Sequence, residues 1–277
     1  MHISIKQNLK KDKSAQSGLA IVIMLFLLVL IAPFFTRDPN AFSKLILSAP
    51  GADFLLGTND LGQDIFSRLL YGLRTSMLVS IGVGVLATSI SVIVGICSGF
   101  IGGIFDIVAM RIIDAFLVMP TIIILILISA FVRPNMLWLI IIISLFNWQG
   151  GARVIRGQTF VLKQRMHIYS ARTFGAKSPY MLVRHIIPDL GHIITVSFIN
   201  NARSAVFLEA GMAFIGISSL TSISLGNIMH NAFKFYYLPV WIWWLLPAGI
   251  LLSLILMSLT FLGNLMENII DPRLNDA

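Results

Sequence analysis

The sequence contains little charge. Of its 277 residues only 12% are charged, whereas 57% are hydrophobic and the mean hydropathy is +0.89. Soluble domains carry about 25% charged residues, and here the apolar residues form uninterrupted blocks instead of the periodic stripes of soluble helices. The composition therefore excludes a soluble globular domain and predicts an all-α integral membrane protein with several spans.

Cysteine and the motifs of enzyme chemistry are also scarce. Cys97 is the single cysteine, which excludes a disulfide framework and a cluster of thiolate metal ligands. We find no Ser-His-Asp arrangement, no H-E-x-x-H motif and no cofactor fingerprint. In the stretch "GAKS" at 175–178 the glycine and lysine are not adjacent, as a phosphate-binding loop requires. The sequence therefore predicts a protein that is not an enzyme, with no cofactor, no metal site and no nucleotide site of its own.

Acidic residues are rare in two basic segments. The N-terminal tail contains four lysines against one aspartate, and residues 153–189 contain seven Lys or Arg against one acid. Residues 36–75 contain four basic and four acidic residues. Because loops rich in Lys and Arg stay in the cytoplasm, we expect the N-terminus and the 153–189 loop to be cytoplasmic and residues 36–75 to be external. Six spans would also place the C-terminus in the cytoplasm.

Six apolar blocks approach, with their flanks, the roughly 20 residues that a membrane-spanning helix needs. They are residues 18–35, 77–101, 115–132, 137–146, 193–215 and 238–262. We divide the chain into a basic tail (1–17), a first transmembrane helix (18–35), an external segment (36–75), a five-helix core (76–266) with a cytoplasmic loop at 153–190, and a C-terminal cytoplasmic tail (267–277). Within the external segment, residues 64–74 fit a short amphipathic helix on the membrane surface.

Small residues recur at four-residue spacing along the second block. They are Ala87, Ser91, Gly95, Gly99 and Gly103. In lipid, such a stripe lets a second helix backbone approach closely. We therefore interpret Gly95, Gly99 and Gly103 as helix-packing residues, with the lining of a permeation path as the alternative.

Polar residues at membrane depth mark two further places. Asn200, Arg203 and Phe207 share one face of the fifth block, and a buried arginine in lipid needs polar surroundings. We interpret this face as a candidate translocation path, where Arg203 either attracts a substrate carboxylate or pairs with an acid of a partner subunit. Arg111 and Asp114 lie three residues apart, and we expect an ion pair there, with a proton-relay role for Asp114 as the alternative.

A basic segment with clear helix start and stop signals interrupts the apolar chain at 168–188. It contains Arg172, Lys177, Arg184 and His185 and no acidic residue. Gly175 ends a first helix, Ser178 and Pro179 are a cap and first-turn proline for a second, and Pro188 stops it. A basic helix-turn-helix facing the cytoplasm is typical of a docking module. The alternative is a plain solvated loop.

The same segment carries a resemblance to a known family. In "YSARTFG…RHIIP" the residues Ala171, Gly175 and Pro188 keep the spacing of the cytoplasmic EAA motif, while Tyr169 replaces its glutamate and Ser170 its first alanine. This motif is typical of the transmembrane permease subunits of ABC importers, and the chain resembles that family.

Further segments narrow the resemblance to the second, C-type permease of the dipeptide, oligopeptide and nickel branch. They are "LLGTNDLGQDIFSRLLYGLRTS" (55–76), "MRIIDAFLVMPTIII" (110–124), "ARVIRGQ" (152–158), "LEAGMAFIGI" (208–217) and "IIDPR" (269–273). Gln63 stands where the family usually has arginine, and Leu225 where it has tryptophan. Arg203 occupies a stretch that is typically small and apolar.

The resemblance implies a fold, partners and a function. The fold is the type I ABC importer permease fold, with six transmembrane helices and a cytoplasmic coupling helix-turn-helix. Residues implied to couple the subunit to its ATPases are Ala171, Arg172, Gly175, Ser178, Arg184 and Pro188. The implied partners are a homologous second permease, two cytoplasmic ATP-binding subunits and an extracellular or periplasmic solute-binding protein. No nucleic acid is expected.

The implied activity is binding-protein-dependent import of di- or oligopeptides across a bacterial or archaeal cell membrane. The alternative cargo is nickel or a metal chelate. A secondary transporter or channel, which would show internal repeats and discontinuous ion-binding helices, is the alternative from a different class.

Overall fold

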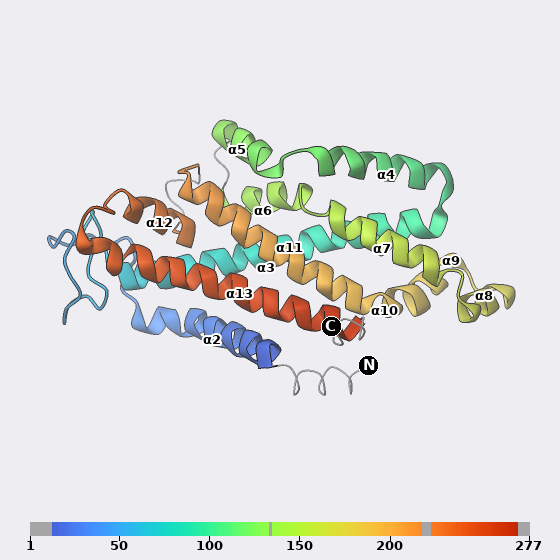
Figure 1. The fold of residues 1–277 in the computed structure, drawn as a ribbon, viewed down its shortest axis with the longest axis horizontal. Helices are drawn as coiled ribbons and strands as arrows, with labels where there is room; N and C mark the ends of the chain where they lie inside the picture. The colour runs from blue at the N-terminus through green and yellow to red at the C-terminus, as the bar shows by residue number, and fades with distance from the viewer. Residues whose placement is uncertain (1–12, 133–134, 218–222, 271–277) are drawn as a thin grey trace.

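The computed structural model describes residues 13–132, 135–217 and 223–270, and most of these are helical (Figure 1). The helices are α2 (Lys13–Phe35), α3 (Ile65–Ile101), α4 (Gly103–Val118), α5 (Thr121–Val132), α6 (Met136–Leu145), α7 (Gln149–Leu162), α8 (Met166–Thr173), α9 (Ser178–Met181), α10 (Ile187–Asp189), α11 (Gly191–Phe214), α12 (Leu225–Phe233) and α13 (Leu245–Ile270). A π-helical turn spans Leu182–Ile186 and a 3-10 turn spans Pro239–Ile242. The described residues contain one isolated β-bridge and no strand, which confirms the predicted all-α fold.

Three helices are long and apolar enough to cross a membrane alone: Lys13–Phe35, Ile65–Ile101 and Pro239–Glu267. Three bent pairs pass the same test together, α4 with α5, α6 with α7, and the 178–189 segment with α11. The described part of the chain therefore offers three spans, or up to six if each bent pair is one span. Most of the predicted tails, residues 1–12 and 271–277, lie outside the described residues.

Helix α3 is a single helix of 37 residues. At 1.5 Å per residue it is about 55 Å long, well beyond the roughly 30 Å hydrocarbon core. The prediction of a separate surface helix at 64–74 is therefore wrong. The apolar face of that stretch packs against protein: Ile65, Leu69 and Leu73 are buried with Leu225 and Trp244 in one core cluster.

Two predicted spans are broken. The block at 115–132 is split between α4 and α5, which meet at 81°. Its break is at Pro120, which forces the preceding Met119 into an extended conformation with ψ 129°. The fourth block, 137–146, coincides with α6, and the flank that was expected to complete this span bends by 47° into α7. Neither break was expected from the apolar sequence.

The spans pack around α3. Three buried clusters follow one another along this helix. Its first turns share one cluster with α12 and α13, its middle shares one with α4, α5, α6 and α11, and its end shares one with α7 and the 168–190 segment. Helix α2 lies alongside α13 (Figure 1), and a Cβ on Gly18 would meet the Phe261 Cβ at 2.6 Å.

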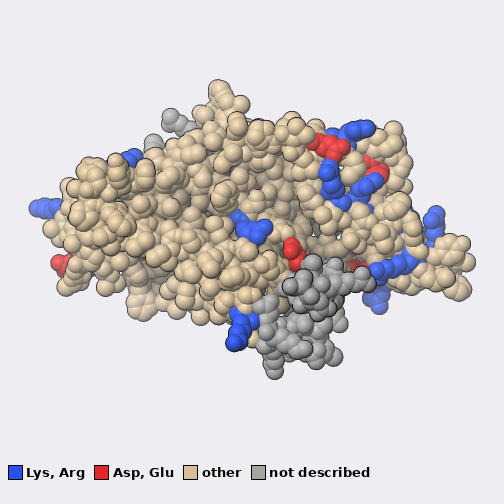
Figure 2. Space-filling model, in the orientation of Figure 1, with Lys and Arg blue, Asp and Glu red and all other residues tan. Residues whose placement is uncertain are grey.

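The surface is mainly apolar. On the face shown in Figure 2, charged side chains gather mainly toward the end that carries α8 and α9. Helix α2 exposes most of its large apolar side chains; among them Phe26, Leu30 and Phe34 are 49%, 54% and 85% exposed. A soluble protein would bury such a face, whereas a helix surrounded by lipid does not.

Candidate functional site

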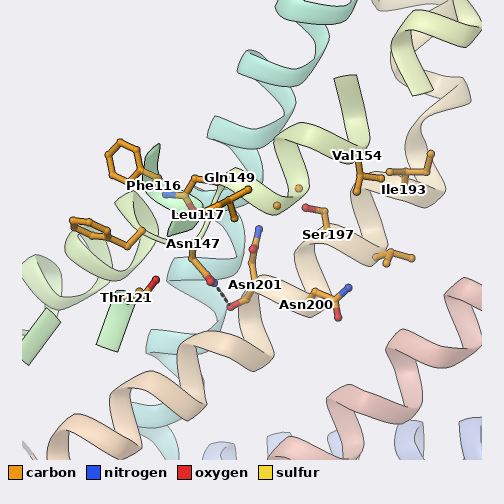
Figure 3. A pocket seen from close by; sticks show the side chains of 14 residues that line it. Phe116, Leu117, Thr121, Asn147, Gln149, Val154, Ile193, Ser197, Asn200 and Asn201 are labelled. Atoms are coloured by element: carbon orange, nitrogen blue, oxygen red, sulfur yellow. Dashed lines mark hydrogen bonds between the residues drawn. The ribbon is translucent and has the colours of Figure 1, made fainter. Parts of the chain in front are cut away.

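A pocket of about 510 Å³ lies where the two helix breaks face α11 (Figure 3). The α4–α5 break contributes Phe116, Leu117 and Thr121; the α6–α7 break and the start of α7 contribute Phe146, Asn147, Gln149, Gly150, Gly151 and Val154; and α11 contributes Ile193, Val196, Ser197, Asn200 and Asn201. Irregular backbone at membrane depth is tolerated where it is buried in protein or lines a cavity. Both breaks contribute residues to the pocket lining, so their irregular backbone lies where it is tolerated.

The pocket lining combines apolar side chains with uncharged polar ones. Its polar side chains are amides and hydroxyls, and they tie three elements together. The Asn147 Nδ2 donates to the backbone oxygen of Asn201 (3.1 Å), as Figure 3 shows, and its Oδ1 accepts from the Ser204 hydroxyl (3.0 Å). The Asn201 Nδ2 donates to the Thr88 hydroxyl on α3 (3.0 Å). Buried amides of this kind are stable only when most of their hydrogen bonds are made.

The structure separates the three residues of the predicted translocation face. Asn200 lines the pocket. Arg203 lies beside the pocket and donates to the Asn200 Oδ1 (3.1 Å) and the Thr260 hydroxyl of α13 (3.4 Å). Phe207 is 62% exposed. Among the described residues, no acid lies within ion-pair distance of Arg203.

The small-residue stripe lies against α7. A Cβ on Gly95 would be 2.7 Å from the Ala152 carbonyl oxygen, and a Cβ on Gly99 would be 2.7 Å from the Arg156 carbonyl oxygen. Gly103 does not belong to this contact, because it begins α4 and no atom lies within 4 Å of its Cβ position. Its assignment to helix packing is therefore wrong.

Two ion pairs join α4 to α7. Arg156 binds Asp106 through two hydrogen bonds of 2.5 Å, and Arg153 pairs with Asp114. The expected pair between Arg111 and Asp114 is wrong. A residue on the neighbouring helix reaches the carboxylate instead, which sequence spacing within one helix does not reveal.

The first half of the basic segment ends as predicted. Gly175 has φ +85°, its N–H donates to the Arg172 carbonyl, and the Ala176 N–H donates to the Ala171 carbonyl, both at 3.0 Å. These two bonds with a left-handed glycine form a Schellman motif, which satisfies the last carbonyls of a helix. The role of Gly175 as the end of α8 is confirmed.

The second half differs from the prediction. Lys177, not Ser178, is the N-cap, while Ser178 and Pro179 stand in the first turn of α9. Pro188 does not end the helical segment, which continues through the π turn to Asp189 and then bends by 66° into α11. In the π turn the Ile187 N–H donates to the Leu182 carbonyl, five residues back. One wide turn of this kind changes the bonding register just before the proline, which has no N–H to donate.

One side of the basic segment packs against α3 and α7, and its other side is exposed. Ile168, Met181 and Ile186 are buried in one cluster with Ile96 of α3 and Ile155 of α7. The residues expected to contact the ATPases lie outside this cluster. Arg172, Gly175, Ser178, Arg184 and Pro188 are exposed, and Ala171 is half-buried. Phe174 and Tyr169, the residue at the glutamate position of the motif, are 90% and 66% exposed. Residues 166–190 are called the basic module below.

Several site residues were missed from the sequence. The stretch "NWQGG" at 147–151 breaks an apolar block with two amides and two glycines, and this was the available signal for Asn147 and Gln149. Glu209 is 3% exposed and accepts a hydrogen bond from the Ser76 hydroxyl (3.2 Å). Nothing in the local sequence of Glu209 predicts a partner 133 residues away.

Two departures from the family pattern have structural roles. Gln63 is 4% exposed and accepts through its Oε1 from the Asn59 Nδ2 (2.8 Å), which closes the turn before α3. Leu225 is fully buried at the start of α12, and its backbone nitrogen would lie 3.2 Å from a Cβ on Gly72. Both residues stabilise the loops that cover the start of α3.

Known proteins match nearly the whole chain. The family model described as "binding-protein-dependent transport system inner membrane component" matches residues 91–276. The dipeptide transport system permease protein DppC of Bacillus subtilis is 29% identical over 272 residues, covering 97% of this chain and 84% of the relative. The oligopeptide transport system permease protein OppC of Mycobacterium tuberculosis is 31% identical over 268 residues, covering 95% of this chain and 91% of the relative.

A solved structure shares the fold. It is an inward facing form of the MetNI methionine ABC transporter, with a TM-score of 0.57 and 16% identity over 74% of this chain and 97% of that one. This likeness confirms the predicted importer-permease fold. Together with the family match, it shows that the chain is a multi-helix membrane permease subunit and belongs to the inner membrane components of binding-protein-dependent transport systems.

Proposed function

We propose that this protein is the transmembrane subunit of an ABC importer that carries di- or oligopeptides across the cytoplasmic membrane. It works with a homologous second permease, two cytoplasmic ATP-binding subunits and an external solute-binding protein. The cargo is inferred from the relatives, which are named for dipeptide and oligopeptide transport and match 95% or more of the chain.

The observation that carries this function is that one helix, α7, joins the basic module to the pocket. Helix α7 begins at the pocket with Gln149 and ends beside the module with Leu162, which is buried in the same cluster as Ile168. Fourteen helical residues span about 21 Å. A displacement of the module is therefore passed to the pocket by one packed helix, as alternating access driven by a separate ATPase requires.

The coupling surface consists of the exposed side of the module. We assign to it Ala171, Arg172, Gly175, Ser178, Arg184 and Pro188. The module has a buried apolar base and an exposed basic side, so a partner can push on it without unfolding it. Tyr169 supplies an exposed aromatic ring where the motif has a carboxylate, and the partner surface is therefore apolar at that point.

The proposed topology has six crossings, with both termini and the module in the cytoplasm. In Figure 1 the end of α13 lies near α10, and the start of α2 is the end of that helix that points in the same direction, as an even number of crossings requires. Reporter tags at residue 45 should respond as external, and tags at 165 and after 277 as cytoplasmic. An external tag at 165 would contradict the coupling mechanism.

Peptide is favoured over nickel or a metal chelate because the relatives are named for peptides. A secondary transporter is disfavoured because the family match is to systems that depend on a binding protein. The test is uptake by the complete complex in liposomes, with ATP inside and loaded binding protein outside. We expect labelled dipeptide or oligopeptide to enter only with ATP, and nickel uptake without peptide uptake would overturn the assignment.

A further inference from the structure

The pocket presents both hydrogen-bond donors and hydrogen-bond acceptors that the described residues leave free. Arg203 holds the Asn200 Oδ1 at 3.1 Å, which leaves the Nδ2 of that amide as a free donor. Thr88 accepts from the Asn201 Nδ2 (3.0 Å) and the Leu145 carbonyl accepts from the Gln149 Nε2 (3.0 Å). The Asn201 Oδ1 and Gln149 Oε1 therefore remain as acceptors. Each amide is fixed at one end and open at the other.

No formal charge lines this pocket. Its fourteen lining residues are all neutral. On the α4–α7 side, Arg153 precedes the lining residue Val154 and pairs with Asp114, so these two charges neutralise each other. Arg203 donates hydrogen bonds to Asn200 and to Thr260 of α13. An unpaired charge in such a setting is strongly disfavoured. The lining therefore suits a neutral ligand that offers both an N–H and a carbonyl oxygen.

We propose that this pocket binds main-chain amide groups of the peptide in transit, through Asn200 as donor and through Asn201 and Gln149 as acceptors. The proposal rests on the peptide-importer function given above. A peptide bond has one donor and one acceptor whatever its side chains, so binding by amides accepts many sequences. The pocket volume of about 510 Å³ lies within the range of small-ligand sites. Arg203 acts as a positioning residue, because it sets which end of Asn200 faces the ligand.

The first test measures uptake of a peptide and of its backbone N-methylated analogue, which lacks the N–H that the acceptors would bind. The complete reconstituted complex is compared as wild type, as Gln149→Met and as Val154→Met. Both variants place methionine on the pocket side of α7, but only the first removes an acceptor. The external binding protein also discriminates between the two peptides. The contribution of the binding protein is the same in all three complexes. It therefore cancels when the uptake ratio of the two peptides in a variant is divided by that ratio in the wild type.

We expect Gln149→Met to reduce the preference for the unmodified peptide by about three- to tenfold, the range that one neutral hydrogen bond supports. Val154→Met should keep the wild-type preference. Equal preferences in all three complexes would overturn the amide assignment while leaving peptide import intact. Absence of uptake of either peptide by the wild-type complex would instead refute the proposed function.

A second measurement does not depend on the stability of Gln149→Met. Because Cys97 is the single cysteine, a Cys97→Ala chain allows one thiol to be placed at will. Asn200→Cys in this background should react with a maleimide more slowly when loaded binding protein and ATP drive peptide through the complex. Leu55→Cys, at an exposed position of the 36–64 segment, should react at the same rate with loaded or empty binding protein. Equal rates at position 200 would place the pocket outside the peptide path and overturn the proposal.

Discussion

The basic module and the pocket are both polar regions of an apolar molecule, and they are built in opposite ways. The module is contiguous in sequence, basic and exposed, and a local Schellman motif fixes its turn. The pocket takes its lining from residues between 116 and 201, on four helices and at the breaks between them, and is neutral and partly open. The difference teaches that one continuous stretch of sequence can form a coupling element. The ligand site, in contrast, needs helix packing to bring together residues that are distant in the sequence.

A glycine of the module and a glycine in the packed core differ in why each must be glycine. Gly175 has open space around its Cβ position and a φ of +85°, so its backbone conformation is what requires glycine. Gly95 has helical backbone but lies against the Ala152 carbonyl oxygen, so the lack of a side chain is what matters. Substitutions at the two positions should therefore fail in different ways.

The largest effect is expected from Gly95→Val. A Cβ there would lie 2.7 Å from a backbone oxygen and 2.9 Å from the Ile155 Cβ. Overpacking costs about 1–3 kcal/mol where side chains can shift, and a backbone oxygen in a packed helix cannot shift freely. We expect little folded protein in the membrane, measured by fluorescence-detected gel filtration. Gly157→Val, on α7 with no atom within 4 Å of its Cβ position, is the control. Equal loss in both variants would contradict the packing explanation.

Gly175→Val should abolish transport while leaving the spans folded. A β-branched residue in the left-handed region costs roughly 1–2 kcal/mol or more, and the chain can avoid that cost by turning the second half of the module away. We expect normal insertion and pairing with the second permease, loss of most uptake, and ATPase activity that does not respond to loaded binding protein.

The matched control for this position is Gly175→Asn, because asparagine tolerates the left-handed region better than other residues. It should retain much of the substrate-stimulated ATPase activity. Wild-type stimulation and uptake in Gly175→Val would show that the module is only a solvated loop.

Arg203→Gln should give an intermediate effect. It removes the guanidinium that holds the Asn200 Oδ1 and reaches Thr260 on α13, so the Asn200 amide can rotate. We expect uptake to slow about three- to tenfold with assembly unchanged, measured on purified complex at matched permease content. Lys234→Gln, at the exposed C-cap position that follows α12, is the control. If the Arg203 variant fails to assemble instead, the residue is structural and pairs with a partner subunit.

The smallest effects should distinguish the two ion pairs between α4 and α7. Arg156 grips Asp106 in a two-bond geometry with side-chain exposures of 34% and 18%, whereas the Arg153 and Asp114 side chains are 49% and 48% exposed. Lysine cannot make the two-bond contact. Arg156→Lys should destabilise the complex by about 1–2 kcal/mol, and Arg153→Lys by less than about 1 kcal/mol. Thermal unfolding of the purified complex measures both, and the reverse order would contradict the geometry.

Sequence reasoning succeeded where neighbouring residues decide the outcome. The left-handed conformation of Gly175 follows from the polar helix before it and the Ser178–Pro179 pair after it. It failed at Pro188, because a π turn a few residues earlier accommodates the proline. It failed again at residues 64–74, because α12 and α13 cover the apolar face that was expected to lie on the membrane.

The sequence by itself determined that the chain is an all-helical membrane permease, because long apolar blocks in lipid must form helices and the basic module carries its own turn signals. Only the tertiary structure decided which side chains meet. It brought Asn147 to Asn201 and Arg153 to Asp114, across 54 and 39 residues. The physical reason is that a buried amide or charge is satisfied by whichever partner packing delivers, and sequence spacing records partners only within one helix.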